Sequence, residues 1–443
     1  MQNQKLVFQD LTRDELEGVL LEVLKQQSSS YVRHSDGAIV NVELSDESIE
    51  RLRKKAKYQA KQIYQWFYQR FVFDFELMSD LAKNLRTWLK ENVEVYHLDE
   101  KFSQQALDGT HKFLWTLFDG KTIESVIIPA ALKEKKFEEA FAAKVSGPGK
   151  AESASAEKTV VTPNPRQVSP SEFAGKESDS ELDGDDWARL TVCISSQVGC
   201  AMACKFCLTG IQGLDRHLKT HEIVAQVWKL RSTAPITNIV FMGMGEPLHN
   251  YDAVVKACKI MLDQNGMSFS KRKITVSTSG LVPAIRELGK AVDISLAISL
   301  NASTDEQRSQ IMPVNKRWPL AELMKACREY PLGSHRRITF EYVMLKDFND
   351  SVQDAARVAE LLRGIPSKIN LIPFNEHPGS EFHRPSDEQV KKFQRYLLDR
   401  NLTTTVRISR GRDILAACGQ LRSIFGSARG TEKHKDVQYS EQQ

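Results

Sequence analysis

A group of closely spaced cysteines is the strongest chemical signal in the sequence. Cys200, Cys204 and Cys207 form a C-x3-C-x2-C motif within a strand-to-helix transition that begins at 191–198. Thiolates at this spacing suit an iron–sulfur cluster, in which three ligands leave the fourth iron open to a substrate. Cys193 supplies a fourth sulfur for a zinc site, but closed zinc sites usually pair two C-x2-C knuckles and this stretch has one. The motif favours an iron–sulfur cluster and leaves zinc as the alternative.

A glycine-containing loop is the second signal. The segment GMGEP at 243–247 lacks the third glycine of a dinucleotide fingerprint and opens no helix pattern. Gly245 permits close approach of the backbone to a ligand, and Glu246 can pair with an ammonium group. An ordinary tight turn is the alternative for so short a motif.

Alternating strand and helix patterns surround both signals. Strand-like runs lie at 191–198, 236–243, 273–280, 293–300, 337–345 and 368–374. The helical patterns that follow them lie at 221–231, 253–264, 281–291, 320–330, 350–364 and 387–400. Six such units predict an α/β fold with a parallel sheet, either doubly wound or a partial barrel. Because ligands bind at the carboxyl ends of such strands, both signals lie where chemistry is expected.

The first third of the chain has a different pattern. A helix is predicted at 11–25, with Thr12 as its N-cap and Glu15 three residues on. A basic helix begins near Asp46, and an Asp-Gly turn joins two strands at 112–129 into a hairpin. We therefore predict a helical and hairpin domain at 1–144.

Residues 145–186 differ in composition from the regions on either side. They contain nine acidic and four basic residues, seven serines and a single aromatic residue. Too little apolar surface is available to offset the entropy of ordering, which predicts an acidic disordered linker or insertion. A core domain follows at 187–425, with a polar tail at 426–443. Outside the linker the chain is more basic than its net charge of +4 suggests, which favours a nucleic-acid partner.

The overall composition is that of an ordinary globular protein. The chain has 443 residues, of which 41% are hydrophobic and 27% charged. Neither a secretory leader nor an apolar run of about 18 residues is present. Seven cysteines in a chain of this length exclude a disulfide-stapled miniprotein. We expect a cytoplasmic protein with reduced thiols and no membrane association, acting as a monomer.

Three longer motifs resemble one known family. The segments SSQVGCAMACKFCLTG, FMGMGEPLHN and RGRDILAACGQL are similar to the RlmN-type radical S-adenosylmethionine (radical SAM) RNA adenine-C2 methyltransferases. The Cfr-type adenine-C8 enzymes are close relatives. The resemblance covers about 50–130 and 187–425. It implies a partial (βα)6 radical SAM barrel with an N-terminal helical and hairpin domain that binds RNA.

The resemblance also implies cofactors and partners. Cys200, Cys204 and Cys207 are implied to hold a [4Fe–4S] cluster, with S-adenosyl-L-methionine as the second cofactor. The implied substrates are 23S ribosomal RNA and the adenosine 3′ of the anticodon in transfer RNA, with an electron-donating reductase system as partner. The implied cofactor contacts follow strands of the predicted core: Gly245, Glu246, Ser277, Ser299, Leu300, Asn301 and Asn375. Some relatives carry histidine at the position of Asn301.

Three catalytic roles are implied in the same way. Cys418 is implied to carry a methyl group, from which a 5′-deoxyadenosyl radical removes hydrogen before the methylene adds to adenine. Cys193 is implied to resolve the adduct by forming a disulfide with Cys418, which suits a transient catalytic pair. Glu124 is implied to accept the C2 proton. By pattern alone, Glu124 is an exposed strand carboxylate, and Cys418 is a small buried helix residue.

Other residues have plainer interpretations. Cys258 and Cys327 lie at helical spacing behind apolar residues, which predicts core packing. The basic helix offers cations for RNA phosphates at Arg51, Arg53, Lys54, Lys55, Lys57 and Lys61. Arg407, Arg410 and Arg412 precede Cys418 and offer a second basic group. Two alternatives stay open: adenine-C8 methylation, and a non-catalytic zinc-stabilised RNA-binding protein, which leaves Cys418 and GMGEP unexplained.

Overall fold

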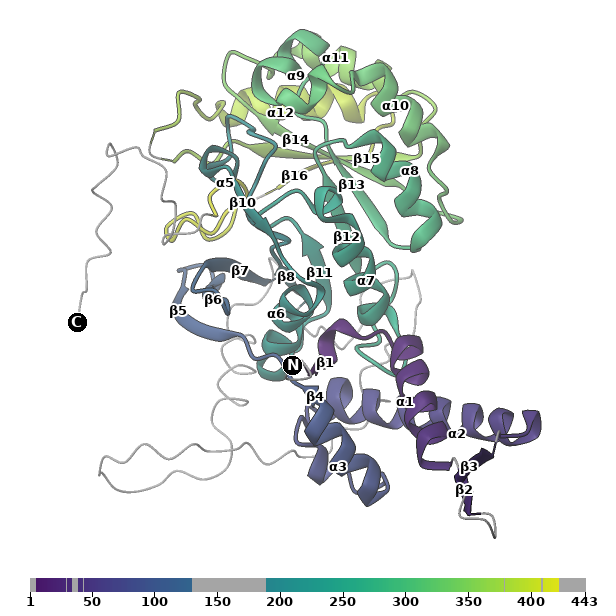
Figure 1. Cartoon of the computed structure of the whole chain (residues 1–443). Helices are drawn as coiled ribbons and strands as arrows, with labels where there is room; N and C mark the ends of the chain where they lie inside the picture. The colour runs from purple at the N-terminus through teal and green to yellow at the C-terminus, as the bar shows by residue number, and fades with distance from the viewer. Residues whose placement is uncertain are drawn as a thin grey trace, which may run out of the picture.

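The structure is a computed structural model that describes residues 5–28, 30–33, 39–42, 44–129, 189–377, 379–407 and 409–421. The predicted linker at 145–186 and the predicted tail at 426–443 lie outside these residues. The described part of the chain forms a helical region at one end and a curved sheet covered by helices at the other (Figure 1).

Seven parallel strands form the centre of the molecule. They are β8 (Leu190–Cys193), β11 (Asn238–Phe241), β12 (Ile274–Thr278), β13 (Ser295–Ser299), β14 (Ile338–Met344), β15 (Ser367–Pro373) and β16 (Thr404–Val406). They pair in chain order, each parallel to the next. Their apolar side chains, such as Ile239, Val276 and Phe340, are fully buried. Continuous runs of buried apolar side chains are expected of parallel strands that are covered on both faces.

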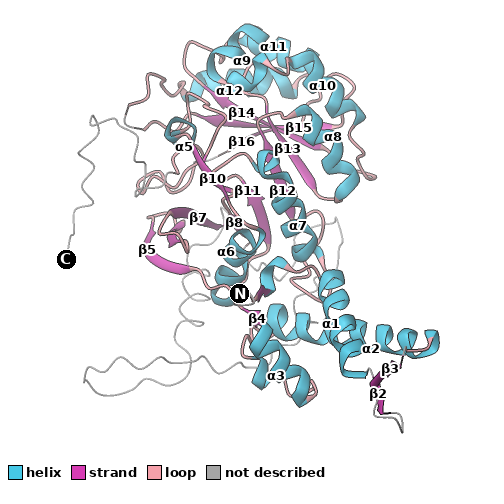
Figure 2. Cartoon of the chain, in the orientation of Figure 1, coloured by secondary structure: helices cyan, strands magenta, loops and turns pink. Residues whose placement is uncertain are grey.

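One helix of each predicted strand–helix unit packs on the outside of this sheet. These helices are α6 (Thr220–Thr233), α7 (Tyr251–Leu262), α8 (Val282–Ala291), α10 (Leu320–Glu329), α11 (Val352–Leu361) and α12 (Asp387–Leu398). Figure 2 shows the helices outside the strand layer. The six predicted units are thus confirmed, in sequential order, as a partial barrel. Cys258 on α7 and Cys327 on α10 are buried in the core as predicted.

Several short elements carry no clear signal in the sequence. Strands β9 (Gln197–Gly199) and β10 (Leu214–His217) pair antiparallel. Two short helices, α5 (Leu208–Gln212) and α9 (Asp305–Ile311), occupy loops at the carboxyl ends of β8 and β13. All four lie in loops near the carboxyl ends of the parallel strands, where ligands bind in folds of this class.

The predicted hairpin is present and belongs to the same sheet as the barrel strands. It comprises β6 (His111–Thr116) and β7 (Thr122–Pro129), preceded by the antiparallel strand β5 (Asp99–Gln105). Strand β7 pairs antiparallel with β8, so the sheet has ten strands in all among the described residues. The hairpin therefore extends the barrel wall next to the first core strand.

The N-terminal helices form a separate layer. They are α1 (Arg13–Ser28), α2 (Asp46–Tyr64) and α3 (Lys83–Asn92), accompanied by the two-stranded pairs β1 (Leu6–Val7) with β4 (Val93–Glu94) and β2 (Ser30–Arg33) with β3 (Ile39–Val42). Thr12 and Glu15 form the predicted capping box, with the Thr12 N–H donating to Glu15 Oε2 at 2.8 Å. Figure 1 shows α1–α3 at the opposite end of the molecule from α8–α12.

Ion pairs and an aromatic stack join this layer to the barrel. Arg13 pairs with Asp263 at 2.8 Å, and Phe67 stacks on Trp228 of α6 with ring centroids 4.9 Å apart. Phe67 is fully buried in the core, whereas Trp66 is only partly buried. Among the described residues, no helix combines the length and apolar character needed to span a bilayer.

Candidate active site

The three motif cysteines lie on one loop at the carboxyl end of β8. The loop runs from β9 to α5, and Cys207 directly precedes the first residue of α5. Its turns are held by backbone bonds, from Cys207 N to the Cys204 carbonyl at 3.1 Å and from Cys200 N to the Gly213 carbonyl at 2.9 Å. A Cβ atom on Gly210 would lie 2.9 Å from the Cys204 backbone, so this glycine is needed for close packing.

The environment of these thiols makes their charged form unfavourable unless a cation lies beside them. Burial raises the pKa of Cys200 to about 12 and that of Cys204 well above its usual value. Burial also raises the pKa of Cys207, and the charges of the three thiolates oppose one another. Iron at the site offsets both effects, because a bound metal deprotonates a coordinating thiol. The donor set therefore fits an iron–sulfur cluster.

The zinc alternative requires sulfurs that converge on one ion. Among the described residues, no group of three or more His, Cys, Asp or Glu side chains is arranged to hold a single metal ion. Cys193, the fourth sulfur of the zinc hypothesis, faces a different pocket, described below. Without Cys193 the motif offers three sulfurs and not the four that a closed zinc site requires.

The GMGEP loop lies directly beside β9. Gly245 has φ +103°, and a Cβ atom there would lie 2.5 Å from the side chain of Gln197. The Glu246 carboxylate is buried and accepts N–H bonds from Leu248 at 3.0 Å and Ser279 at 2.7 Å. Burial raises the pKa of this carboxyl group, and the bonds from Ser279 and Leu248 oppose the shift. Glu246 thus joins the loops after β11 and β12, and each of its oxygens has capacity for a further donor.

The remaining predicted cofactor contacts follow β12 and β13. Ser277 is buried on β12, and Ser299 and Leu300 close β13. Asn301 has φ +56°, and its side chain is engaged by protein groups: its Oδ1 accepts from Val343 N at 2.8 Å. Its Nδ2 contacts the sulfur of Met312 at 3.3 Å. The Asn301 side chain therefore ties the end of β13 to β14.

Arg308 on α9 is a site residue that the sequence patterns did not reveal. Its guanidinium is fully buried and donates to the carbonyls of Leu300 at 3.0 Å, Ser299 at 3.0 Å and Ser279 at 2.6 Å. Burial lowers the pKa of Arg308 to about 10, and the charge of Cys204 opposes that shift. Arg308 therefore braces two cofactor loops beside the cluster motif. A lone arginine in a short helix offers no spacing signal from which this could be read.

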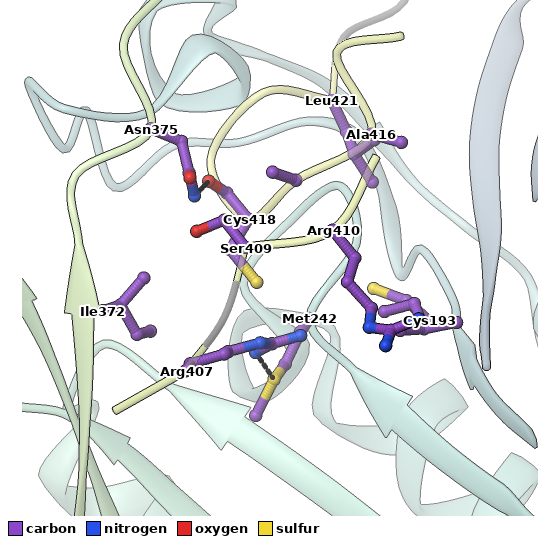
Figure 3. Close-up of a pocket in the computed structure, with 12 residues that line it drawn as sticks. Cys193, Met242, Ile372, Asn375, Arg407, Ser409, Arg410, Ala416, Cys418 and Leu421 are labelled. Atoms are coloured by element: carbon purple, nitrogen blue, oxygen red, sulfur yellow. Dashed lines mark hydrogen bonds between the residues drawn. The ribbon is translucent and has the colours of Figure 1, made fainter. Parts of the chain in front are cut away.

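Asn375, after β15, connects the cofactor loops to the C-terminal segment. Its Nδ2 donates to the backbone carbonyl of Cys418 at 3.3 Å (Figure 3). Its Oδ1 is buried, and among the described residues no donor bonds to it. Since buried polar atoms are nearly always paired, this oxygen fits a contact to a bound cofactor.

Cys193 and Cys418 line a single pocket. The lining of the pocket comes from β7, β8, the loop after β11, β15 and the C-terminal loop, and it includes Ile128, Met242, Arg407 and Arg410. Figure 3 shows the last three of these with the two cysteines. Cys418 lies in a turn-rich loop, so its interpretation as a helix residue is wrong. This loop also packs on the cluster loop, because Leu208 N donates to the Gly419 carbonyl at 2.8 Å.

Arg407 gives this pocket its charge. Its Nη1 lies 3.8 Å from the sulfur of Met242. The charge of Cys418 raises the pKa of Arg407, with smaller contributions from Glu341 and Cys193. Burial raises the pKa of Cys193 to about 12, the charge of Cys418 raises it further, and Arg407 opposes both. Arg407 thus favours the thiolate form of Cys193, and it lines the same pocket as Cys418.

Glu124 lies on the same face of the sheet as Cys193. Val126 on β7 pairs directly with Cys193, and Glu124 is two residues along β7, so all three share one face. The backbone carbonyl of Glu124 accepts a hydrogen bond from Ser195 Oγ at 2.6 Å. This bond places Glu124 just beyond the carboxyl end of β8. Its side chain is 2% exposed, so the interpretation as an exposed strand carboxylate is wrong.

The turn between β5 and β6 holds the C-terminal loop. Asp108 accepts from Gly411 N at 2.8 Å, and its backbone carbonyl accepts from Arg410 Nη1 at 3.2 Å. In the other direction, the Asp413 carboxylate on the C-terminal loop accepts a hydrogen bond from Leu107 N at 3.1 Å. The hairpin therefore contacts the site twice, through Glu124 on β7 and through this turn.

Comparisons with known proteins agree with this geometry. Residues 194–359 match the model of the radical SAM superfamily, and residues 47–95 match that of the ribosomal RNA large subunit methyltransferase N-terminal domain. The dual-specificity RNA methyltransferase RlmN of Geobacter sulfurreducens is 44% identical over 90% of this chain and 96% of its own length. RlmN 2 of Myxococcus xanthus is 42% identical over 86% of this chain and 89% of its own.

A solved structure extends the similarity to the fold. The crystal structure of a radical SAM methyltransferase from Sphaerobacter thermophilus matches with a TM-score of 0.67 and 36% identity. The match covers 94% of this chain and 99% of that one.

Proposed function

The chain belongs to the RlmN family of radical SAM RNA methyltransferases, and from this premise we propose that it methylates C2 of adenosine in 23S ribosomal RNA and in transfer RNA, 3′ of the anticodon. The observation that carries the proposal is the pocket shared by Cys193 and Cys418. A methyl group borne by one cysteine and released by a second requires two thiols within reach of each other. The zinc-stabilised binding protein does not account for this pair.

As a radical SAM enzyme, the protein uses a [4Fe–4S] cluster and S-adenosylmethionine. We assign Cys200, Cys204 and Cys207 as cluster ligands, and Gly245, Glu246, Ser277, Ser299, Leu300, Asn301 and Asn375 as the surroundings of S-adenosylmethionine. When bound, the cluster supplies the electron that cleaves S-adenosylmethionine to a 5′-deoxyadenosyl radical. An external reductase system provides that electron in the proposed cycle.

Cys418 takes the central role in the proposed reaction. Its thiolate accepts a methyl group, the S-methyl group gives up a hydrogen atom, and the resulting methylene bonds to C2 of adenine. Arg407 lines the same pocket as this thiol and supplies positive charge there. This radical route through a cysteine suits the substrate, because C2 of adenine is electrophilic and a poor acceptor for direct polar methyl transfer.

Glu124 and Cys193 complete the proposed cycle. The adduct gives up its C2 proton to Glu124 and its odd electron to the bound redox cofactor. Cys193 then attacks the sulfur of Cys418, the bond between that sulfur and the methylene carbon breaks, a disulfide forms, and the released carbon takes up a proton to become the methyl group of the departing RNA. The location of both residues on one sheet face supports their action on the same substrate. Because all of these groups come from one chain, a monomer suffices.

RNA contact is proposed for two basic surfaces. The cations of α2, from Arg51 to Lys61, are exposed, as is Arg412 close to Cys418. Charge at these positions neutralises phosphates, while the target adenine must leave its stack to reach a buried pocket. We place the enzyme in the cytoplasm, where its RNA substrates and a reduced pair of thiols are both available.

Nucleoside analysis tests the proposed function. Ribosomal and transfer RNA treated with the reconstituted enzyme should yield 2-methyladenosine, and mass spectrometry should find Cys418 methylated. Formation of 8-methyladenosine instead would establish the Cfr-type alternative. The absence of methyl from Cys418 in active protein would overturn the cysteine-borne route.

A further inference from the structure

A buried ion pair lies behind the proposed proton acceptor. Lys112 Nζ on β6 lies 3.3 Å from Glu124 Oε1 on β7. The side chains are 4% and 2% exposed, respectively. Lysine and glutamate are almost never buried to this degree unless they are paired, and a buried pair often contributes little net stability. The pair therefore calls for an explanation other than stability.

The sheet register places the pair next to the cysteines. Lys112 pairs directly with Val126, and Val126 pairs directly with Cys193, so these residues form one row across three strands. Glu124 lies on the same face, one row closer to the loops at the carboxyl end of β8. The lysine is thus on the catalytic face of the sheet and not on its outer face.

Burial and the neighbouring ammonium group have opposite effects on the Glu124 carboxylate. Burial favours the neutral acid, which cannot accept a proton, and an adjacent ammonium group favours the carboxylate. The other charged side chains that line the neighbouring pocket, among the described residues, are Arg407 and Arg410 on the opposite, C-terminal loop. Lys112 lies at ion-pair distance from Glu124 Oε1 and therefore acts on this carboxylate directly.

We propose that Lys112 is a positioning residue that keeps Glu124 ionised and correctly aimed for removal of the C2 proton. This inference rests on the proposed function of Glu124. In the step concerned, the C2–H bond breaks, its electron pair remains with the ring, and the proton passes to a carboxylate oxygen of Glu124. Lys112 does not touch the substrate and makes no bond in this step.

The position of this step in the cycle yields a sharp test. Methylation of Cys418 and formation of the RNA adduct both precede loss of the C2 proton. Lys112→Met should therefore leave iron content and Cys418 methylation unchanged, reduce methylated RNA at least about tenfold, and accumulate RNA covalently bound to Cys418. Lys112→Arg, which retains the charge, should restore most of the product, and Glu124→Gln should stall at the same point as Lys112→Met.

The other possible results separate the role of Lys112 from the role of Glu124. A Lys112→Met enzyme that releases product at the wild-type rate overturns the inference, provided that Glu124→Gln is impaired. A Glu124→Gln enzyme with normal product overturns the role of Glu124 itself. If Lys112→Met loses iron, Lys112→Gln and Lys112→Arg are compared in its place. Loss of Cys418 methylation in all three variants shows that the pair is structural and also overturns the inference.

Discussion

The carboxylate of Asp108 accepts a hydrogen bond from the backbone N–H of Gly411 at 2.8 Å, so the hairpin turn holds the loop that carries Cys418. The same carboxylate accepts the N–H of Thr110 at 2.9 Å, which keeps the turn in shape. One aspartate thus links the hairpin that contributes Glu124 to the segment that contributes Cys418.

Replacing Asp108 with alanine should loosen this loop. Two backbone N–H groups lose a charged acceptor, at a cost of about 2 kcal/mol. We expect slower methylation of Cys418, measured by mass spectrometry over time, with little change in iron content. Asp74→Ala is the matched control, because it removes a carboxylate–backbone bond to Glu76 far from the site. Equal effects of the two variants would show that Asp108 has no special relation to the loop.

Replacing Cys193 with alanine should trap the reaction. Without a second thiol, no disulfide can form, so RNA should remain covalently bound to Cys418 and migrate with the protein on a denaturing gel. Cys418→Ala should give neither adduct nor product. Free methylated RNA at normal yield from Cys193→Ala would remove Cys193 from the resolving role.

The resolving step should accelerate as the pH rises. Burial raises the pKa of Cys193 to about 12, so the thiol is protonated near neutrality and its attacking thiolate increases with pH. Decay of the adduct after a pH jump should quicken by up to roughly tenfold per pH unit below that pKa. Arg407→Gln should slow the decay at every pH, because the cation that favours the thiolate is lost. A decay rate that is independent of pH would contradict this assignment.

Removing one cluster ligand should abolish iron binding. After anaerobic reconstitution, Cys204→Ala should lack the brown colour and bind little iron, because a cluster needs all three thiolates. Cys258→Ala is the matched control: its thiol is buried in α7 away from the motif, and its iron content should equal that of the wild type. A colourless wild-type protein that retains zinc would favour the rejected alternative.

Arg308→Met should destabilise the cofactor loops. The buried carbonyls of Ser279, Ser299 and Leu300 lose their donor, at a cost on the order of 3 kcal/mol in the free energy of unfolding, measured in urea. Binding of S-adenosylmethionine should weaken as well, as measured by calorimetry. Arg328→Met, on the exposed surface of α10, should change the free energy of unfolding by less than about 0.5 kcal/mol. Unchanged stability of Arg308→Met would mean that water replaces the guanidinium.

Local features of this protein could be predicted from the sequence alone. The spacing of Cys200, Cys204 and Cys207, the capping box of Thr12 and Glu15, and the six strand–helix units each depend on residues close together in the chain. Hydrophobic periodicity and capping residues predict such elements directly, because both depend on interactions between residues close in the chain. The order of the strands did not follow from these patterns, which left a doubly wound sheet and a partial barrel open; the structure decided for the sequential order of a barrel.

Only the tertiary structure decided which distant residues meet. By pattern, Glu124 was an exposed strand residue and Cys418 a helix residue; pairing of β7 with β8 buries the first beside Cys193, and the C-terminal loop brings in the second. Arg308 and Lys112 gave no signal, since their roles depend on carbonyls and a carboxylate supplied by other elements. The physical reason is that sheet register and loop docking are set by the packing of the whole core, which no local spacing records.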